Sequence, residues 1–297
     1  MNDNVKVSFK DGFRIMQLTD LHLVRTGDGP EQRELDMIRN LIALERPDFV
    51  AVTGDLSLSD TSDCCYRVFC DFMDGFSIPW AYAMGNHDGE LGPGYEALEQ
   101  ILYWSSTCLY RHGMPHLASH GTYTITLVEG KGDPVWVLYF LDTHAEGYLS
   151  HEQKLWYLAR RDEINRDAGR TVPALTFMHI PFREYQKVWD AGAPGIRMEG
   201  ICAMGNDNGM LRAMQEKGDM RGVFVGHDHV NDFAGMYNGI LLAYGRGSCN
   251  GEQYIGGIKR GGYIYPGYIP GCRMIVLQRD SFETYVRLED GTLLYKD

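Results

Sequence analysis

The chain lacks long apolar segments and cysteine pairs at metal-binding spacing. No run reaches the 18 apolar residues that a membrane-spanning helix needs, so no transmembrane helix is expected. The first residues, Met1 to Lys6, lack the apolar core of a secretory signal. The seven cysteines form an odd set without a Cys-x-x-Cys pair, which favours free thiols over a disulfide framework. These absences predict a cytoplasmic protein.

Basic residues are also scarce. Lys and Arg number 28 against 40 Asp and Glu, which gives a formal charge of −12. Such a chain has no basic face to hold long nucleic acid by counterion release, and anionic membrane surfaces repel it. We therefore expect neither long nucleic acid nor a membrane as a partner. The hydrophobic fraction of 44% is enough for a sizeable core.

The order of the expected elements indicates an α/β fold. Three segments have helical patterns, and they are residues 31–45, 64–73 and 151–165. Ser150 is the expected N-cap of the third helix, with Gln153 at its N3 position. Residues 135–141 form an expected central strand, and residues 273–277 and 282–288 an expected hairpin. No linker, repeat or low-complexity tract precedes residue 245, so we expect a single domain over residues 1–297.

Five short apolar runs each end in residues that can bind a metal. The blocks that follow these runs are Asp20-Leu21-His22, Gly54-Asp55, Gly85-Asn86-His87-Asp88, Met178-His179 and Gly226-His227-Asp228-His229. The runs are short and β-rich, which is typical of buried strands. In α/β sheets, ligands bind at the loops that follow the carboxyl ends of the strands. We therefore expect the five loops to meet in space.

The residue types suit two divalent metal ions. The candidate ligands are Asp20, His22, Asp55, Asn86, His179, His227 and His229. Zn, Fe and Mn accept this mixture of carboxylate, amide and imidazole, whereas Ca and Mg prefer oxygen alone. Taken singly, a lone Asp after a strand more often caps a turn, and a lone buried His is more often only hydrogen-bonded. Five such loops in one chain make coincidence a poor explanation.

These blocks, in this order, resemble those of the calcineurin-like metallophosphoesterases, in particular the small single-domain branch related to purple acid phosphatases. The resemblance spans residues 13 to 229. It implies a four-layer αββα sandwich, with two mixed β-sheets flanked by helices, and hydrolysis of phosphate esters. It also implies two metal ions (Mn, Fe or Zn), one held by Asp20, His22, Asp55 and His229 and the other by Asp55, Asn86, His179 and His227. His87 would face the phosphate and Asp88 would orient it, as the two catalytic residues.

One position departs from the purple enzymes. Those enzymes place a metal-binding tyrosine three residues after the Gly-Asp aspartate, and this chain has Leu58 there. The dinuclear site does not depend on that residue. The ferric-tyrosinate chemistry of the purple enzymes, however, is not expected here.

The activity we expect is that of a phosphomonoesterase that uses a metal-bridging hydroxide. Its substrate would be a small phosphorylated molecule or a phosphoprotein. A phosphodiesterase acting on small cyclic or diester substrates is the alternative. The acidic balance disfavours a nuclease, and the presence of all seven candidate ligands disfavours a non-catalytic scaffold.

Residues 245–271 form an unusual segment, with nine glycines, four tyrosines and the cations Arg246, Lys259 and Arg260. It is either a substrate loop, in which Arg246 binds phosphate, or a long surface connection whose glycines only permit turns. The histidines at 112, 116 and 120 follow no strand and are expected to be surface or hydrogen-bonding groups. His144 does follow an expected strand, so its assignment stays open.

Overall fold

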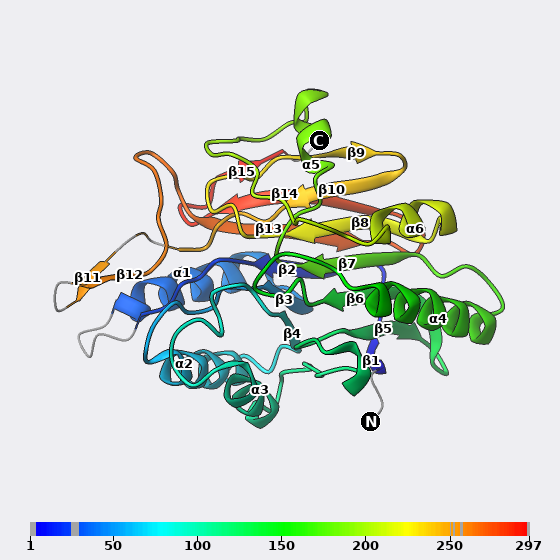
Figure 1. Ribbon diagram of the computed structural model, residues 1–297, viewed down its shortest axis with the longest axis horizontal. Coiled ribbons are helices and arrows are strands. Elements are labelled where there is room, and N and C mark those ends of the chain that lie inside the picture. Colours follow the sequence, from blue (N-terminus) through cyan, green and yellow to red (C-terminus); the bar gives the residue numbers. More distant parts are fainter. Residues whose placement is uncertain (1–3, 25–29, 250, 252, 256–257, 296–297) are drawn as a thin grey trace.

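Two mixed β-sheets pack face to face, with helices on both outer sides (Figure 1). The computed structural model describes residues 4–24, 30–249, 251, 253–255 and 258–295. In the first sheet the strands lie in the order β15 (Leu293–Leu294), β14 (Phe282–Leu288), β13 (Gly271–Leu277), β2 (Phe13–Leu18), β3 (Phe49–Thr53) and β4 (Trp80–Ala83). Strands β2, β3 and β4 are parallel, and the C-terminal hairpin β13–β14 joins them antiparallel through β2.

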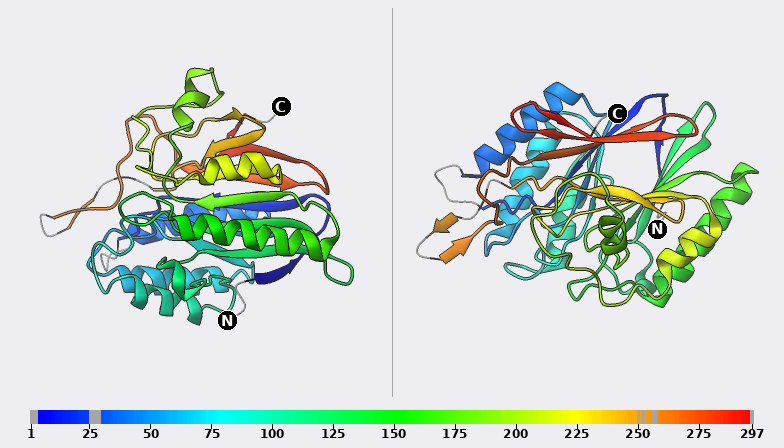
Figure 2. Two further views of the ribbon diagram at one scale, coloured as in Figure 1. Left: turned by 45° about the vertical axis from the view of Figure 1, so that its right-hand side comes forward. Right: turned by 90° about the horizontal axis from the view of Figure 1, so that it is seen from above.

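The second sheet has seven strands. Their order is β1 (Asn4–Ser8), β5 (Tyr123–Glu129), β6 (Asp133–Leu141), β7 (Ala174–Met178), β8 (Met220–Val225), β10 (Ile240–Tyr244) and β9 (Ala234–Tyr237). The pairs β5–β6 and β9–β10 are antiparallel and the others are parallel. A separate two-stranded ribbon, β11 (Gln253–Ile255) with β12 (Ile258–Arg260), projects from one side of the molecule (Figure 2).

The helices form the two outer layers. One layer is α1 (Pro30–Glu45), α2 (Ser62–Asp74) and α3 (Tyr95–Trp104), which share a hydrophobic core with the six-stranded sheet. The other includes α4 (His151–Ala168) and α6 (Met210–Lys217), which pack on the seven-stranded sheet. The short helix α5 (Tyr185–Asp190) lies against β9, and a 3₁₀ turn spans Pro115–Leu117. The expected αββα layering is confirmed.

Alternation along strand β6 explains why two cores form. Leu138 and Phe140 point into the core between the sheets, while Tyr139 and Leu141 point to the core under α4. Successive residues of a strand face opposite sides, so a strand buried on both faces is apolar throughout. The expected strand at 135–141 is therefore found, two residues longer at its start.

The other expected elements are confirmed with small shifts at their ends. At α4, the Ser150 side chain accepts a hydrogen bond from the backbone N–H of Gln153, and the Gln153 side chain accepts one from the backbone N–H of Ser150. This is the reciprocal cap that the sequence predicts. In the part of the chain that the structure describes, no helix has both the length and the apolar character needed to cross a membrane.

Candidate metal centre

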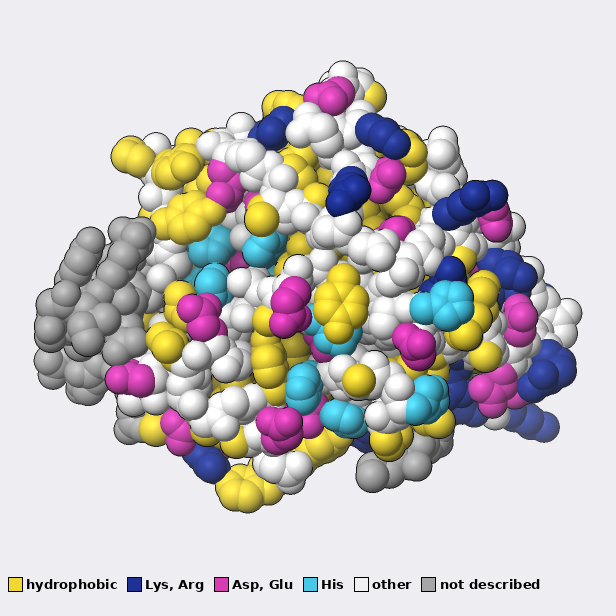
Figure 3. Space-filling view, viewed as in Figure 1, with side chains coloured by type: hydrophobic (Ala, Val, Ile, Leu, Met, Phe, Trp, Pro, Cys, Tyr) yellow, Lys and Arg dark blue, Asp and Glu magenta, His cyan; other side chains and the backbone are white. Residues whose placement is uncertain are grey.

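The five predicted loops do meet, and they come from both sheets. Strands β2, β3 and β4 of the six-stranded sheet lead into the loops with Asp20, Asp55 and Asn86. Strands β7 and β8 of the seven-stranded sheet lead into those with His179 and His227. All seven predicted ligands lie together, and we name this group the candidate dinuclear centre. Figure 3 shows histidine side chains in a hollow on the left of one face.

One half of the centre contains Asp20, His22, Asp55 and His229, which are all buried. The Nε2 atoms of His22 and His229 are 3.0 Å apart. His22 Nε2 lies 3.7 Å from Asp55 Oδ2, and His229 Nε2 lies 3.8 Å from Asp20 Oδ1. His229 Nδ1 lies 3.2 Å from the carbonyl oxygen of Tyr263, which leaves the lone pair at Nε2 when Nδ1 carries the proton. Four ligand atoms thus converge on one point.

The other half contains Asp55, Asn86, His179 and His227. His179 Nε2 is 3.2 Å from Asp55 Oδ2 and 3.0 Å from Asn86 Oδ1. His227 approaches through Nδ1, which is 3.3 Å from His179 Nε2. His179 Nδ1 lies 2.8 Å from the carbonyl oxygen of Thr53, which fixes a proton on Nδ1 and leaves Nε2 as the atom that would bind a metal ion. Asp55 is the carboxylate common to both halves.

A second observation, independent of the ligand geometry, also indicates that the centre suits metal ions. Asp55 Oδ2 is buried and has no hydrogen-bond partner among the described residues, although a buried carboxylate oxygen normally has one. Burial alone would raise the pKa of Asp55, but the imidazoles of His179 and His22 outweigh it and hold that pKa well below its usual range. Burial would lower the pKa of His179, yet Asp55 and Asp20 raise it to about 10. The protonated imidazoles thus place positive charge beside Asp55, a role that bound cations would take over.

The backbone is bent to aim these side chains. Asp20, His22, Asp55 and His227 have φ values of 54°, 46°, 54° and 76°, in the left-handed region that residues with a Cβ seldom adopt. Such conformations cost about 1 kcal/mol each or more and tend to occur at functional sites. A Cβ on Gly85 would lie 2.1 Å from Asp55 Oδ1, so only glycine fits in that block.

Asp88 does not orient His87, which corrects the prediction. Its buried carboxylate accepts hydrogen bonds from the backbone N–H groups of Asp55 (3.1 Å), Leu56 (3.0 Å) and Gly85 (2.8 Å). Asp88 lies in a turn closed by the hydrogen bond from the backbone N–H of Glu90 to the carbonyl oxygen of His87, and its side chain points inward. The partner of His87 Nδ1 is Glu90. Asp88 instead ties together the loops that carry Asp55 and Asn86.

Arg246 does not reach the centre, so the prediction that it binds phosphate is wrong. The side chain is buried, forms an ion pair with Asp232 at 2.6 Å and donates to the carbonyl oxygen of Ile269. Its guanidinium also lies over the ring of Tyr268, 3.7 Å from the centroid. These contacts neutralise the positive charge of Arg246 and hold the segment against the core. Asn250, Glu252, Gly256 and Gly257, and the side chains of Lys259 and Arg260, lie outside the described residues.

Another part of the same segment does border the centre. A cleft of about 420 Å³ opens beside the metal-ligand cluster, and its lining residues include His22, Leu58, His87, Glu199, Gly262 and Tyr263. A Cβ on Gly262 would lie 2.8 Å from the His22 ring, so the segment packs on the candidate ligands. The ring of Tyr263 stacks on His229, with centroids 4.3 Å apart. The alternative of a substrate loop is thus favoured for residues 261–263.

Sequence reasoning missed Glu199 as part of the cleft. Its carboxylate accepts hydrogen bonds from the hydroxyl of Tyr263 and from the backbone N–H of Val230, the latter at 3.0 Å. Glu199 follows no strand and belongs to no ligand block, so no pattern singled it out. His144, whose assignment was open, lies outside both halves and stacks on Tyr148 at 4.2 Å.

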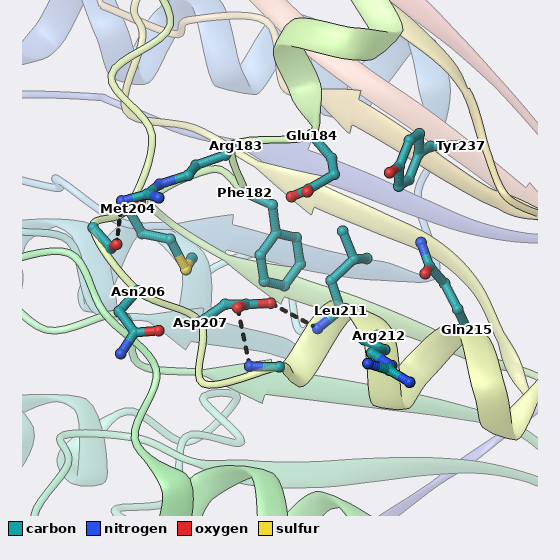
Figure 4. A pocket seen from close by; sticks show the side chains of 12 residues that line it. Phe182, Arg183, Glu184, Met204, Asn206, Asp207, Leu211, Arg212, Gln215 and Tyr237 are labelled. Carbon is teal, nitrogen blue, oxygen red and sulfur yellow. Dashed lines mark hydrogen bonds between the residues drawn. The ribbon is translucent and has the colours of Figure 1, made fainter.

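A second cavity, of about 380 Å³, lies beside α6 (Figure 4). Asp207 there accepts hydrogen bonds from the backbone N–H groups of Gly209 and Leu211, both at 3.0 Å, at the start of the helix. Arg183 donates to the carbonyl oxygen of Met204 at 3.3 Å. No cluster of metal ligands among the described residues includes a residue of this cavity. The chemistry-bearing groups belong to the other cleft.

Relatives by sequence are phosphatase-like proteins. "Probable inactive purple acid phosphatase 29" of Arabidopsis thaliana is 28% identical over 343 residues, covering 97% of this chain and 85% of that protein. "Phosphatase DCR2" of Saccharomyces cerevisiae is 27% identical over 302 residues, covering 85% of this chain and 51% of that protein.

Solved structures share the fold. A dimetal phosphatase from Danio rerio has a TM-score of 0.62 at 13% identity, covering 94% of this chain and 97% of that one. The purple acid phosphatase PPD1 from yellow lupin has a TM-score of 0.54 at 14% identity, covering 95% of this chain and 52% of that one. The sequence model of the family described as "Calcineurin-like phosphoesterase" matches residues 13–231. Members of this family bind two divalent metal ions, and the buried Asp/His cluster described above suits them. The chain belongs to the calcineurin-like phosphoesterase family.

Proposed function

We propose that this chain is a dinuclear metal-dependent phosphoesterase that hydrolyses phosphomonoesters. Its substrate would be a small phosphorylated molecule or a phosphoprotein. The observation that carries the proposal is the pair of ligand clusters that share Asp55 beside an open cleft. Mn, Fe and Zn all suit the donor set, whose imidazoles and carboxylates face one another at 3.2–3.8 Å. The cytoplasmic location stays a prediction.

The chain's own groups have distinct roles in this proposal. Bound metal ions would act as Lewis acids that activate water and neutralise phosphate charge. Burial, reinforced by the charge of His179, lowers the pKa of His227 to about 3, so this imidazole stays neutral and available as a ligand. Asp88 fixes the distance between the Asp55 and Asn86 loops through its backbone hydrogen bonds. The Glu199–Tyr263 pair closes one side of the cleft.

His87 is the proposed proton donor to the leaving oxygen. It lines the cleft, and its ring lies 5.8 Å from that of His22. Its backbone N–H donates to Asp55 Oδ1 at 2.9 Å, which places it over the centre. With the Nδ1 proton directed at Glu90, Nε2 is the atom that delivers a proton.

Removing the imidazole should separate proton donation from metal binding. We expect His87→Ala to keep both metal ions and to lose roughly 10²–10⁴ in rate. Alkyl phosphates, whose alkoxide leaves poorly, should lose most, and nitrophenyl phosphate should lose least. Glu90→Gln should give a weaker version of this pattern. Equal losses of rate on both substrates would mean that His87 only binds phosphate. Loss of a metal ion from the variant would mean that His87 supports metal binding and is not the proton donor.

A phosphodiesterase is the second candidate, and the charge of the cleft favours it. None of the described residues that line the cleft is Lys or Arg, whereas Glu199 and Asp228 are acidic. A diester carries one negative charge and a monoester up to two, so a diester is repelled less by these carboxylates, an effect that opposes the stronger attraction of a monoester to bound metal ions. Comparing kcat/KM for nitrophenyl phosphate and bis-nitrophenyl phosphate separates the two candidates.

The same assay tests for a scaffold without activity. Protein loaded with Mn, Fe or Zn would be assayed beside Asp55→Asn, which lacks the shared carboxylate, and His144→Ala as the matched control. We expect turnover in the wild type and the control and none in Asp55→Asn. Two bound metal ions with no turnover of either ester would establish a binding protein instead.

A further inference from the structure

Another set of metal-ligand side chains lies beside α3 and shares no residue with the candidate dinuclear centre. Glu99 on α3 meets His112 and His120 from the following segment. Glu99 Oε1 is 2.9 Å from His112 Nδ1 and 3.1 Å from His120 Nδ1. These separations match those between ligand atoms in the candidate dinuclear centre, which begin at 3.0 Å. Figure 3 shows histidine side chains gathered near α3 as well.

The backbone holds the two histidines in place. The carbonyl oxygen of His112 accepts hydrogen bonds from the backbone N–H groups of Gly121 (3.1 Å) and Thr122 (3.3 Å). Gly113 has φ of 93°, and a Cβ there would lie 2.2 Å from the carbonyl oxygen of Thr122. Only glycine allows the two segments to approach this closely. The backbone itself therefore brings both histidines close to Glu99, so their approach does not depend on side-chain rotamers alone.

The carboxylate is crowded by donors. The hydroxyl of Tyr110 also donates to Glu99 Oε1, at 2.6 Å, so three donors compete for this one oxygen when both Nδ1 atoms carry protons. A cation bound by Glu99 and by the Nδ1 lone pairs of both imidazoles removes this crowding. The surroundings favour positive charge, since Glu99 contacts both imidazoles and the carboxylate of Asp142 accepts a hydrogen bond from the backbone N–H of His120 at 2.7 Å.

We propose that Glu99, His112 and His120 form a third metal site, which takes a borderline cation of the Zn²⁺ class. Two imidazole nitrogens and one carboxylate oxygen are a common zinc ligand set, and a water completes the tetrahedron. The side chains of His112 and His120 are 36% and 26% exposed, so the fourth position is open to solvent. The metal at this site is exchangeable.

Tyr95 connects this site to the candidate dinuclear centre. Its ring stacks on His120, with centroids 4.7 Å apart and planes at 14°. Its hydroxyl donates to the carbonyl oxygens of Gly85 (3.1 Å) and Asn86 (3.4 Å). A cation that fixes His120 therefore also steadies the loop that presents Asn86 and His87.

Zinc counting tests the proposal directly. Wild type, His112→Ala and Glu99→Gln would be dialysed against buffered free Zn²⁺ and analysed for zinc per chain. His116→Ala is the matched control, because His116 is an exposed histidine of the same segment outside the cluster. We expect His112→Ala and Glu99→Gln to bind one zinc ion fewer than wild type and the control. In an Asp55→Asn background, where the dinuclear centre is impaired, His112→Ala should remove the remaining zinc.

Thermal unfolding supplies an independent readout. Added Zn²⁺ should raise the melting temperature of Asp55→Asn but not of Asp55→Asn with His112→Ala, because a ligand stabilises only the state that binds it. If Glu99→Gln does not fold, His112→Ala alone carries the test, since its side chain is partly exposed. Identical zinc counts in wild type, His112→Ala and His116→Ala would overturn the third site and leave the proposed phosphoesterase function intact.

Discussion

Replacing Asp88 with asparagine should loosen the candidate dinuclear centre and destabilise the fold together. The Asp88 side chain is fully buried and accepts four hydrogen bonds. Oδ2 accepts from the backbone N–H groups of Asp55 and Gly85 and from the hydroxyl of Tyr82, at 3.1, 2.8 and 2.5 Å. Oδ1 accepts from the backbone N–H of Leu56 at 3.0 Å. The side chain thus joins the loops that follow β3 and β4.

The cost follows from this geometry. An asparagine can keep its oxygen where three donors meet, but its NH₂ then faces the N–H of Leu56. One charge-assisted bond is lost and a buried donor is left unpaired, a loss of roughly 2–4 kcal/mol. Burial and the charge of Asp55 raise the pKa of Asp88 to about 6, so its ionised form already carries a cost that asparagine avoids. We therefore expect a net loss of about 2 kcal/mol, or about 30-fold in the unfolding equilibrium.

Denaturant unfolding in the presence of a chelator measures the loss of unfolding free energy, and elemental analysis measures the metal content. Asp74→Asn is the matched control. The carboxylate of Asp74 also accepts four hydrogen bonds, from Ser105, Ser106 and Thr107, but it lies outside the ligand clusters. Asp74→Asn should lose stability and keep its metal ions, whereas Asp88→Asn should lose both.

One result would refute this reasoning. Asp88→Asn might keep its stability and its metal ions and lose rate only on substrates with poor leaving groups. Asp88 would then act through His87, as the sequence alone suggested, and the four hydrogen bonds would be energetically minor.

Three further predictions concern the metal ions and charge. Asp55→Asn should impair both metal sites and His22→Ala mainly one, as elemental analysis with anomalous diffraction would show. Oxidised, iron-loaded protein should show no strong visible band, because Leu58 supplies no phenolate, and a band lost on mutating some tyrosine would contradict this. In metal-free protein, the hydrogen bond with Glu99 raises the pKa of His120 above its unfolded value of about 6.5. The protonated imidazole therefore stabilises the fold below pH of about 6.5, and this stabilisation is lost as the pH rises through the folded-state pKa. Unfolding free energies of wild type and His120→Gln should therefore converge at alkaline pH.

The sequence predicted the five ligand-bearing strands well because they are almost wholly buried. Strand β3 spans Phe49–Thr53, as its apolar run predicts, and β2 spans Phe13–Leu18. Each run ends abruptly in Gly or in a polar ligand, so its boundary is visible in the sequence. The seven candidate ligands follow from these boundaries, because a residue just after a buried strand has its place fixed.

Pairing between strands could not be predicted in the same way. The five ligand-bearing strands divide between two sheets, whereas the edge of one parallel sheet would have explained the pattern equally well. Strand β13 pairs with β2 across most of the chain, with Ile275 opposite Ile15. Residue periodicity shows which faces are buried but carries no information on which strand lies beside which.

Side-chain partners distant in sequence account for the errors. Adjacency suggested that Asp88 holds His87, but the turn sends Asp88 inward to backbone donors. Arg246 is a cation near the ligand blocks in sequence, yet Asp232 neutralises it in the core. His112 and His120 are partly exposed hydrogen-bonding groups, as expected, but their common partner Glu99 could not be predicted, because only the closure of their segment brings them to it. In each case the deciding contact is tertiary.

The backbone strain in the candidate dinuclear centre indicates how stable this fold would be without bound metal ions. Asp20, His22, Asp55 and His227 all have positive φ, which together costs about 4 kcal/mol or more. Asp20 and Asp55 are also buried carboxylates, and one oxygen of Asp55 has no hydrogen-bond partner in the part of the chain that the structure describes. A typical domain is stable by only about 5–15 kcal/mol, so these terms are a large fraction of the whole. Cations bound between the carboxylates and imidazoles would offset them, whereas a scaffold without metal ions would rely on imidazoles such as that of His179, whose pKa is raised to about 10, to balance the carboxylates. The geometry of this chain therefore argues for a metal-loaded protein, even though some relatives have names that describe them as probably inactive.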